Sequence, residues 1–287
     1  MANDKADRPD TPSEADILNA VRKSGYVLDQ EAATVLENLG YHVQTSWPFQ
    51  DPDLGESREL DVFAHREVPT TGQIRVFMEL LCECKSGEDR PFVFLSRRRS
   101  VTDTAIAPEQ FVFPCRRYGR QLENGMTEVS GFEYLELAKY HYWFAREIKA
   151  VQLAKIVRNR DRWEAQHDGI YNALLLPLAK ALTHRIEENR KFTSMINLCF
   201  PVVVLKSPIY EIDTSIAPLV AKPVPHVSFH RRLDSKTVKG SFIFDFATLD
   251  GLADLVVNTI TPFVEKVVAL AQESPARLLP RSLQAKP

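Results

Sequence analysis

Hydrophobic residues in the first part of the chain recur every three to four positions, which is the period of one face of an α-helix. This pattern predicts a helix from Ser13 to Gly25 and a second helix over residues 27–39. Ser13 is the expected N-cap, because its hydroxyl can accept a hydrogen bond from a free amide of the first turn. Gly25 and Gly40 are the expected ends, because glycine readily adopts the left-handed conformation that closes a helix.

After Gly40 the hydrophobic period shortens to two, which is typical of β-strands. Two of the expected strands read Arg-Glu-Leu-Asp-Val-Phe-Ala and Phe-Met-Glu-Leu-Leu-Cys-Glu-Cys-Lys, and a polar turn containing Gly72 separates them. The strands are predicted over residues 41–47, 58–64, 77–85 and 91–95.

The second half of the chain alternates the same two periods over longer elements. A nearly continuous apolar run at residues 196–205 indicates a central strand that is covered on both faces. Aromatic residues between Phe132 and Arg158 predict a long helix. The remaining elements are a helix over about 168–190, a strand pair at 226–230 and 241–246, and a last helix over about 249–272.

These elements define an α/β fold with a mixed central sheet flanked by helices. We expect one domain over residues 13–273, with flexible tails at 1–12 and 274–287. The segment from about 96 to 160 is expected to be a helical and basic insertion, and the region that follows residue 208 to be a C-terminal β/α extension.

The strand pair at 58–64 and 77–85 carries the strongest chemical signal in the sequence. Residues two apart on a strand point to the same face, so Glu83 and Lys85 share a face. If Asp61 meets them from the neighbouring strand, two carboxylates and one ammonium group converge. Carboxylate oxygens and water are the ligands that Mg²⁺ prefers, and a lysine beside them can orient a water or stabilise charge on a phosphate.

This order of elements, with Asp61 on one strand and Glu83-Cys84-Lys85 at the end of the next, resembles the PD-(D/E)xK nuclease superfamily, which has the restriction-endonuclease-like fold. The resemblance implies that Asp61, Glu83 and Lys85 are catalytic. It also implies that Asp61, Glu83 and the backbone carbonyl of Cys84 bind Mg²⁺ or Mn²⁺. Many members have a further glutamate on the first core helix, and Glu31 holds that place here.

The expected function is therefore hydrolysis of phosphodiester bonds, most readily in DNA. Two alternatives stay open: a nuclease-like fold that is catalytically idle and serves as a nucleic-acid-binding or protein-interaction module, or an unrelated α/β protein that works by binding a partner chain. The sequence is also compatible with a homodimer in which the aromatic stretch around Tyr140 forms the contact between the two chains.

Clusters of basic residues are candidates for phosphate contacts, because arginine donates paired hydrogen bonds to phosphate oxygens. The alternative is that these residues are ordinary solvated loops. The candidates for nucleic-acid binding are Arg97, Arg98, Arg99, Arg116, Arg117 and Tyr118.

Composition narrows the classes of protein that remain. The net charge of −2 means that nucleic acid would have to bind a local basic surface. Two of the four cysteines, Cys82 and Cys84, lie in an apolar strand, which favours a reduced, cytoplasmic protein over a disulfide framework. The N-terminus is polar, and no apolar run reaches the roughly 18 residues that a membrane span needs, so no membrane partner is expected.

Overall fold

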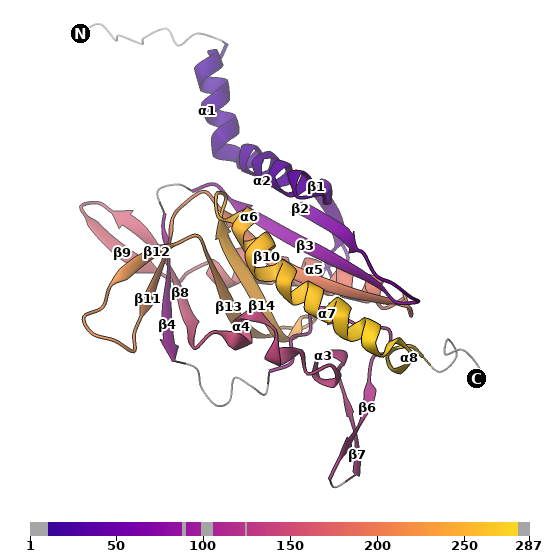
Figure 1. Ribbon diagram of the computed structural model, residues 1–287. Coiled ribbons are helices and arrows are strands. Elements are labelled where there is room, and N and C mark those ends of the chain that lie inside the picture. Colours follow the sequence, from indigo (N-terminus) through magenta and orange to yellow (C-terminus); the bar gives the residue numbers. More distant parts are fainter. Residues whose placement is uncertain (1–10, 88–89, 99–105, 124, 281–287) are drawn as a thin grey trace, which may run out of the picture.

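A large mixed β-sheet forms the frame of the protein, and helices cover both of its faces (Figure 1). The computed structural model describes residues 11–87, 90–98, 106–123 and 125–280. In the sheet the strands follow the order β1-β2-β3-β10-β14-β13-β8-β4-β11-β12, with β5 paired to β10 and β9 paired to β8. The structure confirms the expected α/β class with a mixed central sheet.

The first hundred residues supply one edge of this sheet and also β4, which lies between β8 and β11. Strands β1, β2 and β3 are mutually antiparallel and follow two helices. The elements are α1 (Glu14–Ser24), α2 (Tyr26–Asn38), β1 (His42–Gln50), β2 (Ser57–Val68), β3 (Arg75–Lys85) and β4 (Phe92–Arg98). All six match elements predicted from the hydrophobic pattern.

The second half completes the sheet and supplies helices for both faces. Strand β10 lies between β3 and β14 and is parallel to both, and its interior position explains the continuous apolar run. The elements are η3 (Tyr171–Leu175), α5 (Leu176–Asn189), β10 (Met195–Leu205), β11 (Ile209–Asp213), β12 (Ala221–Val224), β13 (His226–Asp234), β14 (Lys239–Thr248), α6 (Leu252–Asp254), η4 (Leu255–Ile260), α7 (Thr261–Glu273) and α8 (Pro275–Leu278).

Two hydrophobic cores lie on opposite sides of the sheet. Leu36 of α2 and Phe263 of α7 pack with the Val62 and Leu80 face of β2 and β3. Leu178 and the rest of the buried side of α5 pack on the other face. Side chains that alternate along β3 therefore enter different cores, which places Leu80 and Leu81 on opposite sides.

The long helix predicted between Phe132 and Arg158 is wrong. Short helical turns occupy the first part, and they are separated by Glu136, which has a left-handed φ of 53°. The second part is a long strand that pairs with β4, because Ile148, Ile156 and other β-branched residues fit a pleated surface. The elements here are β5 (Phe111–Val112), β6 (Tyr118–Leu122), β7 (Gly125–Val129), α3 (Gly131–Tyr134), η2 (Leu137–Lys139), α4 (Tyr142–Ala145), β8 (Ile148–Asn159) and β9 (Arg162–Gln166).

The two ends of the chain also differ from the expected tails. Residues 275–278 form α8, and Leu278 and Leu279 are buried in the core, so the predicted tail at 274–287 begins too early. Residues 281–287 and residues 1–10 of the expected N-terminal tail lie outside the described residues. None of the helices in the described part of the chain has both the length and the apolar character needed to cross a bilayer.

Candidate active site

Strand β2 separates from β3 at the point where the candidate acidic residues lie. The antiparallel pairing of the two strands runs from Val68 to Val62, whereas β3 continues to Lys85 against β10. Asp61 fills the gap that opens: its Oδ2 accepts a hydrogen bond of 2.7 Å from the backbone amide of Cys84. The amide and carbonyl of one strand residue point to the same side, so the Cys84 carbonyl also faces Asp61.

A backbone irregularity in β1 accompanies this gap. Thr45 pairs with Val62 and Trp47 pairs with Leu60, but Ser46, which lies between them, has a left-handed φ of 51°. Such a conformation is strained for a residue that has a side chain, and it occurs most often where function requires unusual geometry. The neighbour of this strained residue across the strand pair is Asp61.

Glu83 and Lys85 project beside Asp61 and form an ion pair. The distance from Lys85 Nζ to Glu83 Oε1 is 2.5 Å. The Glu83 side chain is 13% exposed and that of Lys85 is 40% exposed, so the carboxylate is sheltered while the ammonium group can reach solvent. The structure thus brings together the three residues that the sequence singled out.

Helix α2 adds Asp29 to this group. A carboxylate oxygen of Asp29, one of Asp61 and the Sγ of Cys84 all lie within 4.8 Å of one another. Asp29 is in the first turn of α2, where the positive end of the helix dipole favours a carboxylate. We call Asp29, Asp61, Glu83 and Lys85 the acidic cluster.

Burial and mutual repulsion make the carboxyl groups of the acidic cluster hard to ionise. Burial and the charge of Asp61 raise the pKa of Asp29 to about 6. Burial raises the pKa of Asp61, and burial together with Asp61 raises the pKa of Glu83. Burial alone would lower the pKa of Lys85, but attraction to Glu83 and Asp61 outweighs it and raises that pKa, so the lysine stays charged.

These groups fit a hard divalent cation better than a soft one. Burial raises the pKa of the Cys84 thiol, so the sulfur carries a proton in the metal-free protein. One sulfur among carboxylates also differs from the Cys and His sets of structural zinc sites. Asp29 and Asp61 bring carboxylate oxygens close together, and Glu83 is a third carboxylate within electrostatic reach of both. Carboxylate oxygens are the donors that Mg²⁺ and Mn²⁺ accept.

Glu31, the expected helix glutamate, lies apart from the cluster. Its Oε2 accepts from Lys206 Nζ at 3.1 Å, and both side chains are more than a third exposed. Asp29, by contrast, precedes the buried Ala32 and Leu36 by three and seven positions, so it lies on the buried face of α2. That helical spacing is the signal from which the sequence could have indicated Asp29.

The residues expected to bind nucleic acid are scattered, and Tyr118 cannot stack on a base. Tyr118 is buried, stacks on Tyr134 with ring centroids 4.8 Å apart, and donates to a backbone carbonyl, so its ring is not free to stack on a base. Arg116 and Arg117 are exposed but follow β5, which pairs with β10 near Asn197, about 25 Å along the strand from Leu205. Arg97 and Arg98 are exposed at the end of β4, and Arg99 lies outside the described residues.

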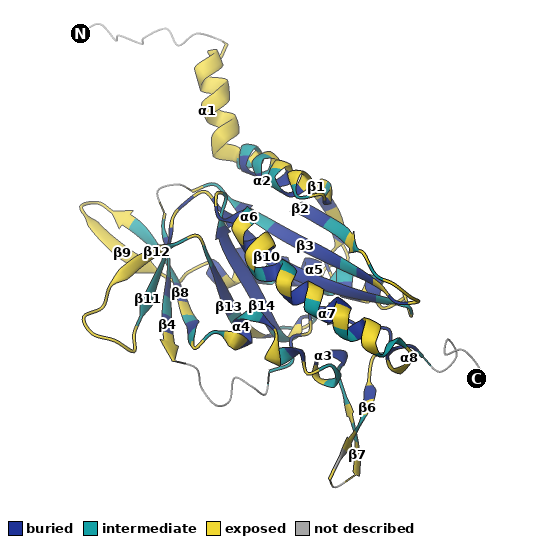
Figure 2. Cartoon of the chain, in the orientation of Figure 1, coloured by how far each residue is buried: buried dark blue, intermediate teal, exposed yellow. Residues whose placement is uncertain are grey.

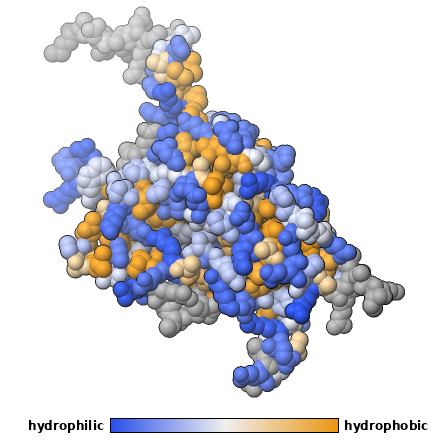
Figure 3. Space-filling model, viewed as in Figure 1, coloured by the Kyte–Doolittle hydropathy of each residue, from blue (hydrophilic) through white to orange (hydrophobic). Residues whose placement is uncertain are grey.

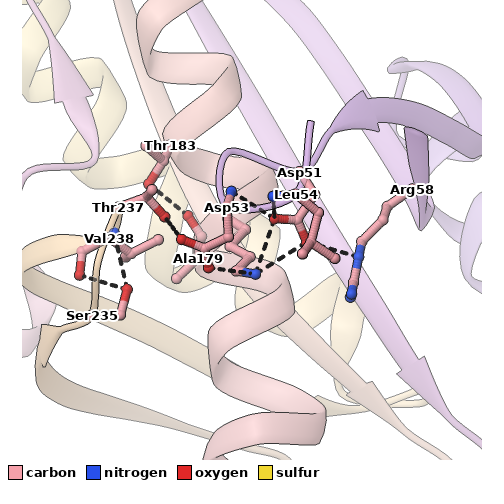
Figure 4. Close-up of polar contacts among 10 residues, drawn as sticks. Asp51, Asp53, Leu54, Arg58, Ala179, Thr183, Ser235, Thr237 and Val238 are labelled. Atoms are coloured by element: carbon pink, nitrogen blue, oxygen red, sulfur yellow. Dashed lines mark hydrogen bonds and ion pairs between the residues drawn. The ribbon is translucent and has the colours of Figure 1, made fainter. Parts of the chain in front are cut away.

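In a second group of charged residues, around Asp51, each carboxylate oxygen already has a partner (Figure 4). Asp51 is fully buried and accepts from Lys180 through both oxygens at 3.0 Å, from Arg58 at 2.8 Å and from two backbone amides. Lys180 also pairs with Asp53, which accepts from Thr237 at 2.6 Å. This group holds the β1–β2 turn to α5 and to the β13–β14 turn, and Lys180 and Arg58 already balance its carboxylate charges.

Comparisons with family models, with curated proteins and with solved structures each found no match. The fold is a mixed α/β architecture with helices on both faces of one sheet. Its most distinctive chemical feature is the acidic cluster where β2 leaves β3.

We predict that, at about pH 7 and above, Asp29→Asn raises the melting temperature of the metal-free protein. The folded-state pKa of about 6 lies above the ordinary value of 3.8. Asp29 therefore favours the folded state below about pH 4, and this contribution is lost as the pH rises through about 6. Thermal unfolding in EDTA across this pH range measures the effect.

The matched control is Glu37→Gln, which removes an exposed carboxylate from the same helix and should leave the melting temperature unchanged. The gain from Asp29→Asn should shrink as the pH falls below about 6 and disappear at about pH 3, where the carboxyl is mostly protonated in both states. A lower melting temperature for Asp29→Asn at neutral pH would contradict the assigned electrostatics.

Proposed function

We propose that this protein is a metal-dependent nuclease that hydrolyses phosphodiester bonds, with DNA as the expected substrate. The observation that carries the proposal is the meeting of Asp29, Asp61, Glu83 and Lys85 where β2 leaves β3. Three carboxylates with raised pKa values gain most from a cation, because its charge relieves their repulsion.

In this proposal each residue of the cluster has a role. Asp61, Glu83 and the Cys84 carbonyl hold Mg²⁺ or Mn²⁺, and Asp29 takes the place that the sequence assigned to Glu31. The cation would polarise a phosphate oxygen and lower the pKa of a bound water. Lys85 orients the attacking water and stabilises the negative charge that develops on the phosphate.

The order of the elements around the cluster supports the restriction-endonuclease-like fold. Helix α2 precedes the antiparallel strands β1, β2 and β3, and helix α5 then leads into β10, which is parallel to β3. This order is the one on which the resemblance to PD-(D/E)xK nucleases rests. The long segment between β3 and α5 adds strands to the far side of the sheet.

The hairpin of β8 and β9 is the basic element best placed to hold nucleic acid. It exposes Arg158, Arg160 and Arg162 together with Trp163, which is 61% exposed as a residue. Arginine contacts phosphates and an exposed indole can stack on a base. The hydrophobic pattern predicted a helix up to Arg158, over the β8 arm, and therefore did not indicate a hairpin.

The hairpin starts near the end of the sheet that carries the acidic cluster. The Phe92 amide donates to the Pro208 carbonyl, three residues beyond Leu205, which pairs with Lys85. Phe92 is also paired with Lys155, from which the β8–β9 hairpin extends. A strand of nucleic acid that contacts the hairpin can therefore extend to the acidic cluster.

The proposal is tested by cleavage of labelled single- and double-stranded DNA and RNA with Mg²⁺, Mn²⁺ or EDTA. We expect cleavage with either metal and none with EDTA. Asp61→Asn and Glu83→Gln should each lower the rate by at least about 100-fold, since each removes a charged ligand. Glu37→Gln, a change of the same kind on an exposed surface of α2, should leave it unchanged.

Calorimetric titration with Mn²⁺ separates a nuclease from an idle nuclease-like module. A working site should bind the ion, with affinity that falls by roughly 10- to 100-fold in Asp61→Asn. A protein that binds DNA but does not bind Mn²⁺ would instead belong to the non-catalytic alternative.

A further inference from the structure

Helix α1 has the sequence of an amphipathic helix but buries none of its side chains. A full capping box between Ser13 and Asp16 begins it, and Gly25, with a left-handed φ of 94°, ends it. Figures 1 and 2 show it projecting from the body of the protein, exposed along its length. An isolated helix of only 11 residues is marginal in water, so this one needs a surface to cover.

The exposed apolar residues of α1 form one stripe. Ile17, Leu18 and Val21 recur at helical spacing, and their exposed fractions are 48%, 47% and 42%. Within the described residues the fold leaves this stripe uncovered.

The stripe continues into an apolar groove between α2 and α6. Val21 belongs to both the stripe and the groove. Tyr26, which is 67% exposed, lies where α1 meets α2. Figure 3 shows hydrophobic surface along α1 and over the region below it. The groove is lined by Val21, Tyr26, Val27, Gln30, Glu31, Thr34, Val35, Leu249, Asp250 and Ala253.

The charges of α1 match those of a second α1 that runs in the opposite direction. Glu14 lies three positions before Ile17 and four before Leu18, so it is at the N-terminal end of the stripe. Arg22 lies four positions after Leu18, at the other end. An antiparallel pair related by a two-fold axis places Glu14 of each copy against Arg22 of the other. The surface is therefore complementary to itself, as a two-fold interface requires.

We propose that α1 is the dimerisation element of this protein and that its partner is α1 of a second copy of the same chain. A pair of helices about 16 Å long is too small by itself for a stable interface, which needs about 1,200–2,000 Å². The end of the groove adds to this interface: the first turn of α1 of each copy reaches Arg22 of the other and so lies beside Val21 and Tyr26, where the groove begins. The inference does not depend on the proposed nuclease function.

Reversing charges on α1 tests the antiparallel arrangement directly. Glu14→Arg and Arg22→Glu each create two like-charge contacts per dimer, so the dissociation constant of the dimer should rise by roughly tenfold or more. The double variant Glu14→Arg/Arg22→Glu restores both pairs and should dimerise like the wild type. An equimolar mixture of the two single variants should form a heterodimer for the same reason.

Sedimentation equilibrium over a concentration series measures these constants on the full chain. Ile17→Asp should give a monomer, whereas Ile216→Asp, which alters an equally exposed isoleucine between β11 and β12, should leave the dimer intact. Circular dichroism should show that the body of each variant remains folded. A wild-type protein that stays monomeric throughout the series would overturn the proposal, as would a dimer that is indifferent to Ile17→Asp or to the charge reversals.

Discussion

Replacing Lys85 with alanine is expected to lower the rate of metal-dependent cleavage by about 10²- to 10³-fold or more. In the structure the ammonium group lies 2.5 Å from Glu83 and its charge also reaches Asp61. It is the one cation of the acidic cluster, and its partial exposure leaves it able to contact a phosphate or a water. Single-turnover cleavage at saturating Mg²⁺ isolates this effect on the chemical step.

Two further variants make the expectation about Lys85 specific. Lys191→Ala removes a lysine whose side chain is 72% exposed in the turn after α5, and the rate should be unchanged. Lys85→Arg keeps the charge but changes the donor geometry, so part of the activity should return. Lys85→Ala protein that keeps its native circular dichroism spectrum and still cleaves at the wild-type rate would remove Lys85 from the mechanism.

Breaking the ion pair between Glu79 and Arg185 is expected to cost about 3–5 kcal/mol of folding stability. Glu79 is 1% exposed, and Arg185 donates to its two oxygens at 2.8 and 2.7 Å. Asn189 donates to the same carboxylate at 3.0 Å. Arg185→Met leaves a buried carboxylate without its counter-charge, and urea unfolding followed by circular dichroism measures the loss.

An exposed pair in the same sheet provides the comparison. Arg75 donates to Glu67 with similar geometry, but both side chains are more than 40% exposed, so Arg75→Met should cost less than about 1 kcal/mol. The double variant Glu79→Leu/Arg185→Met should recover much of the stability lost in Arg185→Met, because no charge is then left buried. Equal costs for Arg185→Met and Arg75→Met would show that burial does not strengthen the first pair.

Local patterns in the sequence determined the elements that form the frame of the protein. Apolar periodicity identified α2, the strands β1 to β4, the central β10 and the helices near residues 168–190 and 249–272. It also placed Asp61, Glu83 and Lys85 near the ends of adjacent strands, where the structure brings them together. Such features depend on neighbours in the sequence and on the alternation of side chains along a strand, which a single chain displays.

Only the tertiary structure decided the features that depend on distant packing. It placed Asp29 rather than Glu31 beside Asp61, because the buried face of α2 is set by its contact with the sheet. Pairing with β4 made a strand of residues 148–159, although their apolar content also suits a helix. The sequence by itself determined where apolar and charged side chains occur, but their burial was fixed by the rest of the fold, since the free energy of burial depends on which surfaces meet.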